Sequence, residues 1–309
     1  MRAPAFWSDP SPNVLAALLA PASALYAAAT ARRVARKGWR APVPVICCGN
    51  AGVGGAGKTT VALDLGRRLR GRGRSVAFLT RGYGADEDML LAAVAPTIVG
   101  ADRAVAARAA IEAGADVLVM DDGLQNATLA KTLSLLVVDG AVGFGNGRVI
   151  PAGPLREPVD AATTRSHALI LIGEDRAGVA AAGCRLPVLR AQLRSAFRPD
   201  EVAGRPVFAF AGIARPEKFF ETLREAGATL AGQRDFSDHH VYTRGELGAM
   251  LDAARSLGAA LVTTPKDAVR LPPDYVEQVH AVDVALEWQD EAALDALLQA
   301  ALRDGASAG

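Results

Sequence analysis

The sequence predicts an α/β protein with two domains, a larger one over residues 1–185 and a smaller one over residues 186–309. Continuous apolar runs such as 43–48 and 134–139 alternate with helical segments, which is typical of a parallel sheet with both faces covered. Half of the 309 residues are hydrophobic and 22% are charged, so the chain can bury a sizeable core. Beyond residue 186 the apolar runs become shorter and polar clusters separate them, which indicates a second, smaller α/β domain.

The net charge of +1 conceals an uneven distribution. Residues 1–40 hold six basic residues against Asp9, a charge of +5, which leaves −4 for the remaining chain. Such a balance does not predict a broad nucleic-acid-binding face. The three cysteines, Cys47, Cys48 and Cys184, form neither a disulfide framework nor a C-x-x-C pair, which favours a reducing cytoplasm.

An apolar segment predicts an N-terminal helix over residues 13–37. Pro21 interrupts the apolar run, and a basic cluster follows at residues 32–40. Two interpretations stay open: a helix lying in a membrane surface beside anionic headgroups, or an ordinary helix packed on the larger domain. A secretory signal is not favoured, because Asp9 and two prolines would occupy the n-region of such a signal.

The clearest motif is G-x-x-x-x-G-K-T at residues 52–59, a phosphate-binding loop. It follows the apolar run 43–48 and precedes a helical pattern, so we expect inward-pointing backbone amides and a helix N-terminus to bind a nucleoside triphosphate. Lys58 would reach the β- and γ-phosphate oxygens, and Thr59 would ligate Mg²⁺. A glycine-rich turn that binds nothing is the alternative, which the order of strand, loop and helix disfavours. The residues predicted to bind the nucleotide are Gly52, Val53, Gly54, Gly55, Ala56, Gly57, Lys58, Thr59 and Thr60.

Charged residues follow the next predicted strand, 75–80. Arg81 and the acidic cluster at residues 86–88 come at its carboxyl end, the edge at which open α/β sheets bind ligands. A solvated acidic turn is the alternative for the cluster. Arg103 lies in the first turn of a predicted helix over 102–113, where its charge opposes the helix dipole, which indicates an anion nearby.

Two further segments complete the predicted site. The buried strand 115–122 ends in Asp121 and Asp122, a pattern in which a strand-end carboxylate holds Mg²⁺ opposite the phosphate loop. Residues 143–158 are too rich in glycine and proline for a helix or a central strand, so we expect a long, functional binding loop. The smaller domain contributes two polar clusters, 236–240 and 263–267, without metal-ligand spacing.

Together these segments resemble one family, the tetraacyldisaccharide 4′-kinases of lipid A biosynthesis. The resemblance runs from about residue 39 to residue 271, and RGYG and GNGRVIPAGPLREP are far more specific than the phosphate loop. The other matching stretches are PVPVICCGNAGVGGAGKTT, VGADRAVAA, DDGLQ, FSDHH and TTPKDAVRL.

The resemblance implies transfer of the γ-phosphoryl group of ATP, with Mg²⁺, to the 4′-hydroxyl of a tetraacylated glucosamine disaccharide 1-phosphate. It also implies a location at the cytoplasmic face of the inner membrane, peripheral or anchored through the N-terminus. Neither a nucleic acid nor a protein partner is expected.

By the same resemblance, Asp86 is the general base and pairs across the domain cleft with a histidine, His239 rather than His240. Lys58 is counted with these catalytic residues. The metal residues it implies are Thr59, Asp121, Asp122 and Glu157. The residues expected at the phosphates or the substrate are Arg81, Arg103, Gln125, Asn146, Arg148, Arg156 and His240.

The sequence departs from the family pattern at three positions and leaves rival functions open. Asn126 stands where histidine is usual, Thr60 where proline is usual and Pro265 where glutamate is usual. One rival is a membrane-associated switch ATPase with a deviant phosphate loop, but that class has a lysine where this chain has Val53. A GTP-binding module is the other, and it lacks support because Lys266-Asp267 is not part of an N-K-x-D motif.

Overall fold

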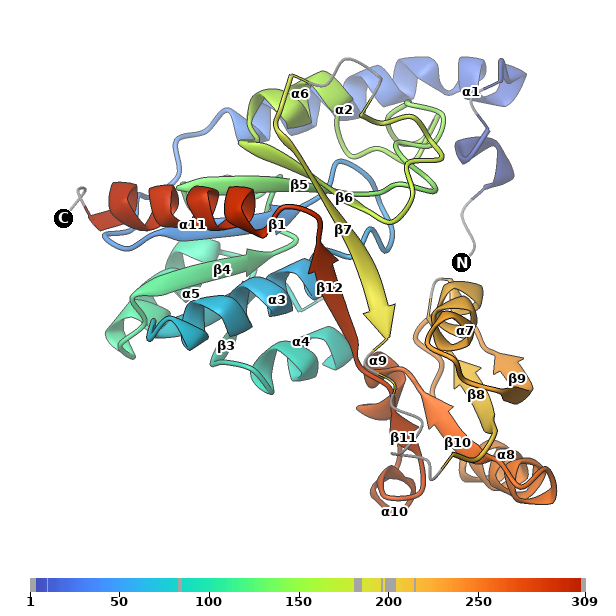
Figure 1. Ribbon diagram of the computed structural model, residues 1–309. Coiled ribbons are helices and arrows are strands. Elements are labelled where there is room, and N and C mark those ends of the chain that lie inside the picture. The colour runs from blue at the N-terminus through green and yellow to red at the C-terminus, as the bar shows by residue number, and fades with distance from the viewer. Residues whose placement is uncertain are drawn as a thin grey trace. The chain divides into compact units, whose positions relative to one another are not determined.

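The computed structural model spans residues 1–309 and describes residues 4–9, 11–82, 85–180, 185–195, 197, 204–213 and 215–306. Cys184 and the last two residues of the RGYG motif, Tyr83 and Gly84, lie outside the described residues. The chain divides into two compact units (Figure 1). The first unit comprises Met1–Gly82, Val94–Gln192 and Trp288–Gly309, and the second comprises Tyr83–Ala93 and Leu193–Glu287.

This division differs from the predicted one at both ends of the smaller domain. The segment Tyr83–Ala93 groups with the second unit because its helix α4 (Ala85–Ala92) contacts helix α9 (Pro265–Ala268). The C-terminal helix α11 (Glu291–Ala306) groups with the first unit. There it contacts helix α3 (Lys58–Gly71) through the ion pair between Glu291 and Arg68.

The first unit is organised on an eight-stranded sheet, and the pairs from β7 to β3 are parallel as the apolar runs predict. Its strand order is β12-β7-β6-β5-β1-β4-β2-β3. The two strands at one edge, β7 and β12, continue into the second unit. The strands are β1 (Val45–Gly49), β2 (Val76–Thr80), β3 (Thr97–Val99), β4 (Val117–Asp121), β5 (Leu133–Asp139), β6 (Ala168–Ile172), β7 (Val188–Ser195) and β12 (Val284–Trp288).

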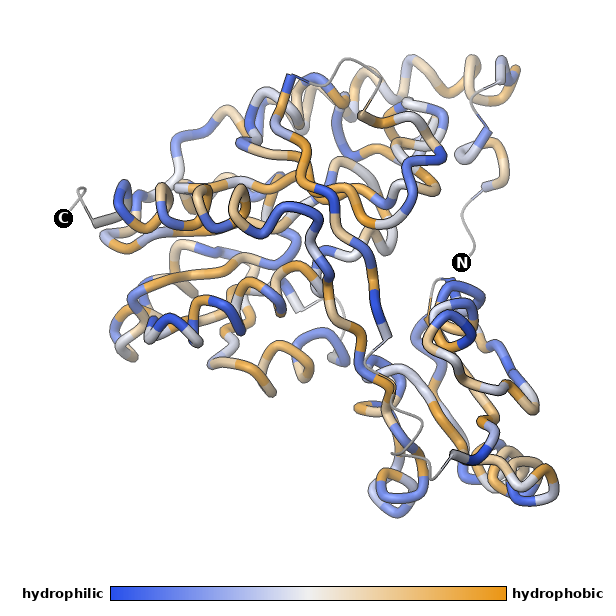
Figure 2. Tube along the Cα trace, in the orientation of Figure 1, coloured by the Kyte–Doolittle hydropathy of each residue, from blue (hydrophilic) through white to orange (hydrophobic). Residues whose placement is uncertain are grey.

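Strand β1 lies at the centre of this sheet, between β5 and β4. Every residue of β1, β2, β4, β5 and β6 is buried, which explains their continuous apolar sequences (Figure 2). Cys48 near the end of β1 is in register with Asp121 at the end of β4. The parallel pairing therefore places the segments that follow β1 and β4 at one edge of the sheet.

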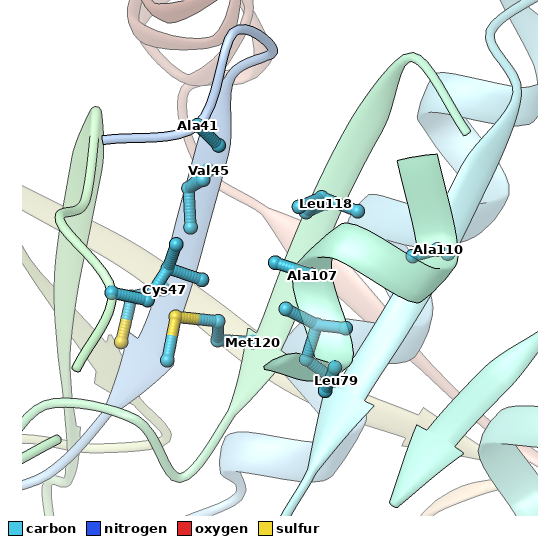
Figure 3. Packing of buried hydrophobic residues seen from close by; sticks show 11 residues of the cluster. Ala41, Val45, Cys47, Leu79, Ala107, Ala110, Leu118 and Met120 are labelled. Atoms are coloured by element: carbon cyan, nitrogen blue, oxygen red, sulfur yellow. The ribbon is translucent and has the colours of Figure 1, made fainter. Parts of the chain in front are cut away.

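One face of this sheet is covered by helix α5 (Arg103–Glu112). Figure 3 shows Ala107 and Ala110 of this helix with Leu118 and Met120 of β4, in one cluster of buried side chains. Alanine side chains let the helix backbone approach the strands closely, so the larger strand residues fill the space between them. A second buried cluster is formed by β5, β6 and helix α6 (Val159–Thr164) with residues of the 143–158 loop.

The predicted N-terminal helix is divided into α1 (Val14–Leu18) and α2 (Ala20–Val34), with Pro21 in the first turn of α2. Ser23 fixes α2 to the 143–158 loop: its hydroxyl donates to the Val149 carbonyl at 2.7 Å and accepts from the Ala152 amide at 3.0 Å. Large apolar side chains of both helices are exposed, among them Val14 and Leu18 of α1 and Leu25 of α2, at 78%, 72% and 74%. Within the described residues, no helix has the length and apolar content needed to cross a membrane.

The second unit has a four-stranded sheet of order β11-β10-β8-β9, with all neighbours parallel. Phe219, Phe220 and Leu223 of helix α7 (Pro216–Glu225) pack on β8 (Val207–Ala211) in its core, as expected for a second, smaller α/β domain. The strands are β8 (Val207–Ala211), β9 (Leu230–Asp235), β10 (Ala260–Thr263) and β11 (His280–Ala281). The helices, besides α4 and α9, are α7 (Pro216–Glu225), α8 (Arg244–Ser256) and α10 (Pro273–Val276).

Local sequence signals explain how the helices of the second unit begin. Thr243 and Glu246 form a reciprocal capping box at the start of α8. Thr264 caps α9 by accepting a hydrogen bond from the Asp267 amide, and Pro265 takes the first helical position, where proline is well tolerated. The departure at Pro265 is therefore compatible with the helix that carries Lys266.

Candidate active site

The phosphate loop connects β1 to α3, as predicted. Gly54 and Gly57 have φ angles of +112° and +87°, a region that favours glycine, and Gly57 is the residue before helix α3. The Lys58 ammonium donates to the Gly54 carbonyl at 3.2 Å and so lies over the loop. The loop also joins the 143–158 segment, because the Val53 amide donates to the Pro154 carbonyl at 2.8 Å. The remaining predicted nucleotide residues, Gly52, Gly55, Ala56 and Thr60, lie in this loop or the first turn of α3.

Thr59 and Asp121 meet at the start of helix α3. The Thr59 hydroxyl donates to Asp121 Oδ2 at 2.8 Å, and Asp121 is 3% exposed. A hydroxyl and a carboxylate are oxygen donors of the kind that Mg²⁺ prefers, and protein Mg²⁺ sites commonly use one or two carboxylates with waters and substrate phosphates. The two residues therefore fit a magnesium ion that accompanies a nucleotide.

The other two predicted metal residues are engaged by arginines. Both oxygens of Asp122 accept from Arg156, at 2.8 and 3.0 Å, and Asp122 Oδ1 lies 3.9 Å from the Lys58 ammonium. Glu157 is 2% exposed and accepts from Arg165 at 2.8 and 2.6 Å. Across the residues that the structure describes, no group of three or more His, Cys, Asp or Glu side chains is arranged to hold a metal ion. The metal role of Asp122 and Glu157 stays a prediction.

Gln125 connects these groups. Its amide nitrogen donates to Glu157 Oε1 at 2.7 Å and to the Asn50 carbonyl at 2.8 Å, while its oxygen accepts from Arg156 at 3.4 Å. Gln125 and Arg156, predicted to contact substrate, thus belong to the carboxylate network beside the phosphate loop. Sequence reasoning missed Arg165 and Asn50. The Asn50 side chain is buried, and its oxygen has no hydrogen-bond partner among the described residues. Its position directly after β1, at the start of the phosphate-binding segment, is the sequence signal that could have identified it.

Arg103 is 1% exposed at the start of helix α5. Its guanidinium donates to the Gly100 carbonyl, and its backbone amide donates to the Thr128 hydroxyl at 3.0 Å. Burial lowers the pKa of Arg103, and the negative charge of Asp122 opposes that shift. The structure thus places this cation inside the first unit, within electrostatic range of the Asp122 carboxylate.

Three other predicted residues occupy different settings. Arg81 follows β2 and is exposed, as is Arg148 in the 143–158 loop. The Asn146 amide nitrogen donates to the carbonyls of Phe6 and Ala152 at 3.1 and 2.9 Å, and its oxygen accepts from the Arg148 amide. These bonds give Asn146 a structural role in shaping the loop.

Asn126, which departs from the family pattern, is also held by its neighbours. Its side-chain oxygen accepts from the amide and hydroxyl of Thr128, both at 3.0 Å. Its carbonyl accepts from the Lys131 ammonium, whose pKa is lowered by burial. The amide at this position therefore stabilises the turn between β4 and β5.

Asp86 lies in the second unit, on helix α4, and is 4% exposed. His239 Nδ1 is 3.3 Å from Asp86 Oδ2. We predicted a pair formed across two domains. That part of the prediction was wrong, because both residues belong to the same compact unit. Lys266 and Arg270 of the TTPKDAVRL segment also approach Asp86 Oδ2, at 3.8 and 3.6 Å, and sequence reasoning had given neither a role.

The structure separates the two adjacent histidines. His239 is exposed and has a φ angle of +58°, a strained conformation for a non-glycine residue. His240 instead stacks on Phe236 at 4.6 Å, and its Nε2 lies 3.2 Å from both oxygens of Glu246. Hydrogen bonds from the Thr243 backbone and hydroxyl, and then from His240, lower the pKa of Glu246 to about 2. The predicted preference for His239 at Asp86 agrees with this geometry, and the substrate contact of His240 stays a prediction.

Strain also marks the first unit's site. Asp122 has a φ angle of +50°, and among the described non-glycine residues only Asp122 and His239 have positive φ angles. Such conformations persist where the surrounding structure fixes them, and they occur often at active sites. Each unit therefore holds one strained residue within a charged cluster.

Comparisons with known proteins agree with this arrangement. The sequence model of the tetraacyldisaccharide-1-P 4′-kinase family matches residues 15–92 and 85–303. A tetraacyldisaccharide 4′-kinase of Gluconacetobacter diazotrophicus is 54% identical over 96% of this chain and 97% of its own length, and one of Rhodospirillum centenum is 50% identical over 96% of each.

A solved structure gives the same result. The crystal structure of LpxK from Aquifex aeolicus in complex with ATP superposes with a TM-score of 0.76 at 26% identity, covering 94% of this chain and all of that one. Both the sequence and the fold thus match over nearly the whole length. The chain belongs to the tetraacyldisaccharide 4′-kinase family.

Proposed function

We propose that this protein is a kinase that transfers the γ-phosphoryl group of ATP, with Mg²⁺, to the 4′-hydroxyl of a tetraacylated glucosamine disaccharide 1-phosphate in lipid A biosynthesis. The family membership supports the reaction, and the ATP complex of the Aquifex aeolicus relative supports the donor. The geometry supports distinct roles for the two charged clusters.

The first cluster suits the donor. Glycines with positive φ angles shape the loop so that its amides can face phosphate oxygens, and Lys58 lies over the same loop. Thr59 and Asp121 would hold the magnesium ion, which when bound neutralises phosphate charge. Arg156 and Lys58 add positive charge beside Asp122. Phosphoryl transfer depends mainly on alignment and charge stabilisation, which such a set of groups supplies.

The second cluster suits the acceptor. In the proposed reaction the acceptor oxygen forms a bond to the γ-phosphorus, the bond from that phosphorus to the β–γ bridging oxygen breaks, and ADP leaves. The hydroxyl proton passes to the Asp86 carboxylate. His239, which lies beside Asp86, would hold the carboxyl group in its orientation. Asp86 is connected to the end of β2 by the short segment 81–84.

We also propose that the N-terminal helices hold the protein at the cytoplasmic face of the inner membrane. The exposed apolar residues of α1 and α2 and the basic residues between 32 and 40 suit the surface of an anionic bilayer. Co-sedimentation with vesicles tests this. Binding to vesicles containing anionic lipid should weaken when Leu18 and Leu25 are both replaced by serine, and equal binding would contradict the proposal.

The observation that carries the kinase proposal is the buried Asp86 carboxylate held beside an exposed, strained His239. A switch ATPase has no need for such a base. The purified protein should convert the disaccharide 1-phosphate lipid, with Mg·ATP, to a product heavier by one phosphate in mass spectrometry. ADP release should rise only when the lipid acceptor is present. Acceptor-independent ATP hydrolysis without a phosphorylated lipid would instead indicate a switch.

A further inference from the structure

Three basic side chains face one buried oxygen in the second unit. Asp86 Oδ2 has His239 Nδ1 at 3.3 Å, Arg270 Nε at 3.6 Å and Lys266 Nζ at 3.8 Å. The oxygen is buried and makes no hydrogen bond within the described part of the chain. Its environment is therefore determined by charge more than by a direct hydrogen bond.

The three basic side chains differ in their other contacts. Arg270 stabilises the local fold through four hydrogen bonds. It donates to the carbonyls of Lys266, His240 and Gly212 and to Asp267 Oδ1. Asp267 is fully buried and also accepts from the Tyr242 hydroxyl at 2.6 Å, which fixes this part of the unit. His239 is the proposed partner of the base.

Lys266 connects two of the three acidic residues of helix α4. Its ammonium donates to Glu87 Oε1 at 2.9 Å while it lies 3.8 Å from Asp86, and its side chain is 23% exposed. Lys266 lies in the first turn of α9, whose start is fixed by the Thr264 cap. A cation held this close to a buried carboxylate favours the charged form of that carboxylate.

We infer that Lys266 is a positioning residue for the transfer reaction: its ammonium places a positive charge beside the buried Asp86 carboxyl group, and its contact with Glu87 holds helix α4 in place. This inference rests on the proposed function, in which Asp86 accepts the hydroxyl proton. The charges facing Asp86 are mixed. The basic groups are Lys266, Arg270 and His239. The acidic groups are Glu87 and Asp88 of the same helix and Asp238, which lies 3.8 Å from His239 Nε2.

The test compares the pH dependence of kcat/KM in the wild type with that in the variants Lys266→Met, Lys266→Arg and Glu87→Gln. Loss of the Lys266 charge should move the acidic limb to higher pH by about 1 unit, since a nearby opposite charge changes a carboxyl titration by at least that much. Lys266→Arg should restore the wild-type limb. Glu87→Gln breaks the same ion pair but removes a negative charge, so its limb should move to lower pH.

The opposite directions separate charge from structure. If Lys266 only held the helix, Lys266→Met and Glu87→Gln would lower activity and leave the acidic limb of the pH profile unmoved. Alternatively, both variants would move that limb in the same direction. Either result overturns the inference. Circular dichroism and melting temperature would check that each variant folds. If Lys266→Met does not fold, Lys266→Gln and Glu87→Gln still give the two directions. A wild type that phosphorylates no lipid would refute the proposed function, whereas an active wild type with an unmoved limb in the Lys266 variants would refute this inference alone.

Discussion

The Thr59 hydroxyl donates a 2.8 Å hydrogen bond to Asp121 Oδ2, which joins the first turn of helix α3 to the end of strand β4. The register of β1 with β4 makes this contact possible, because it pairs Cys48 with Asp121 just before the phosphate loop begins. Two segments separated by about sixty residues thus form one oxygen-donor pair.

Replacement of Thr59 by alanine should lower kcat/KM about 10- to 100-fold, since groups that hold or orient metal ligands typically have effects of that size. Thr59→Ser retains the hydroxyl and is the matched control. Titration of Mg²⁺ in the kinase assay provides the measurement, with a higher Mg²⁺ requirement expected for alanine than for serine. Identical Mg²⁺ dependence in the two variants would show that the hydroxyl does not act on the metal.

The backbone strain at His239 gives a second prediction. Both His239→Ala and His239→Gly remove the imidazole, so both should lower kcat by a similar factor, about 10-fold or more. Only glycine relieves the φ angle of +58°, so His239→Gly should be more stable than His239→Ala by about 1 kcal/mol. Urea unfolding of the two variants measures the difference. Equal stability would mean that His239 does not adopt this conformation in solution.

The two buried cysteines of strand β1 predict alkaline instability. Burial raises the pKa of Cys47 from its ordinary 9.0 to about 11, and it raises the pKa of Cys48 well above 9.0. Above pH 9 the unfolded thiols lose protons that the folded ones keep, so stability present below pH 9 is lost as the pH rises, by about 1.4 kcal/mol per pH unit for each thiol.

Urea unfolding at several pH values between 8 and 10.5 measures this loss. A Cys47→Ala, Cys48→Ala double variant is the control, and its free energy of unfolding should fall less steeply with pH. Parallel slopes for the wild type and the double variant would contradict the prediction.

Those parts of the fold and site that depend on local sequence could be predicted. The phosphate loop, Asp121 at a strand end and the Gly- and Pro-rich 143–158 loop each have a short-range pattern that fixes the backbone. The parallel sheet also followed from its continuous apolar strands. Strand β7 lacks such a run, and its residues alternate in burial over much of its length.

Contacts between segments distant in the chain could not be predicted from local sequence patterns. The roles of the two histidines are separated by the stacking of His240 on Phe236 and its pairing with Glu246, which no spacing reveals. The grouping of Asp86 with the second unit depends on contacts between α4 and α9. The hydrogen bond from the Asn146 amide to the Phe6 carbonyl also joins segments far apart in the chain, and the predicted substrate contact of Asn146 stays a prediction.

The central claim is that Asp86 accepts the proton of the acceptor hydroxyl while ATP is bound independently on the phosphate loop. The most direct measurement is a paired assay of Asp86→Asn, with lipid phosphorylation followed by mass spectrometry and ATP affinity followed by calorimetry. The account predicts transfer lowered about 10²- to 10⁴-fold, the usual contribution of a general base, with ATP affinity close to that of the wild type. Wild-type transfer by Asp86→Asn would contradict it.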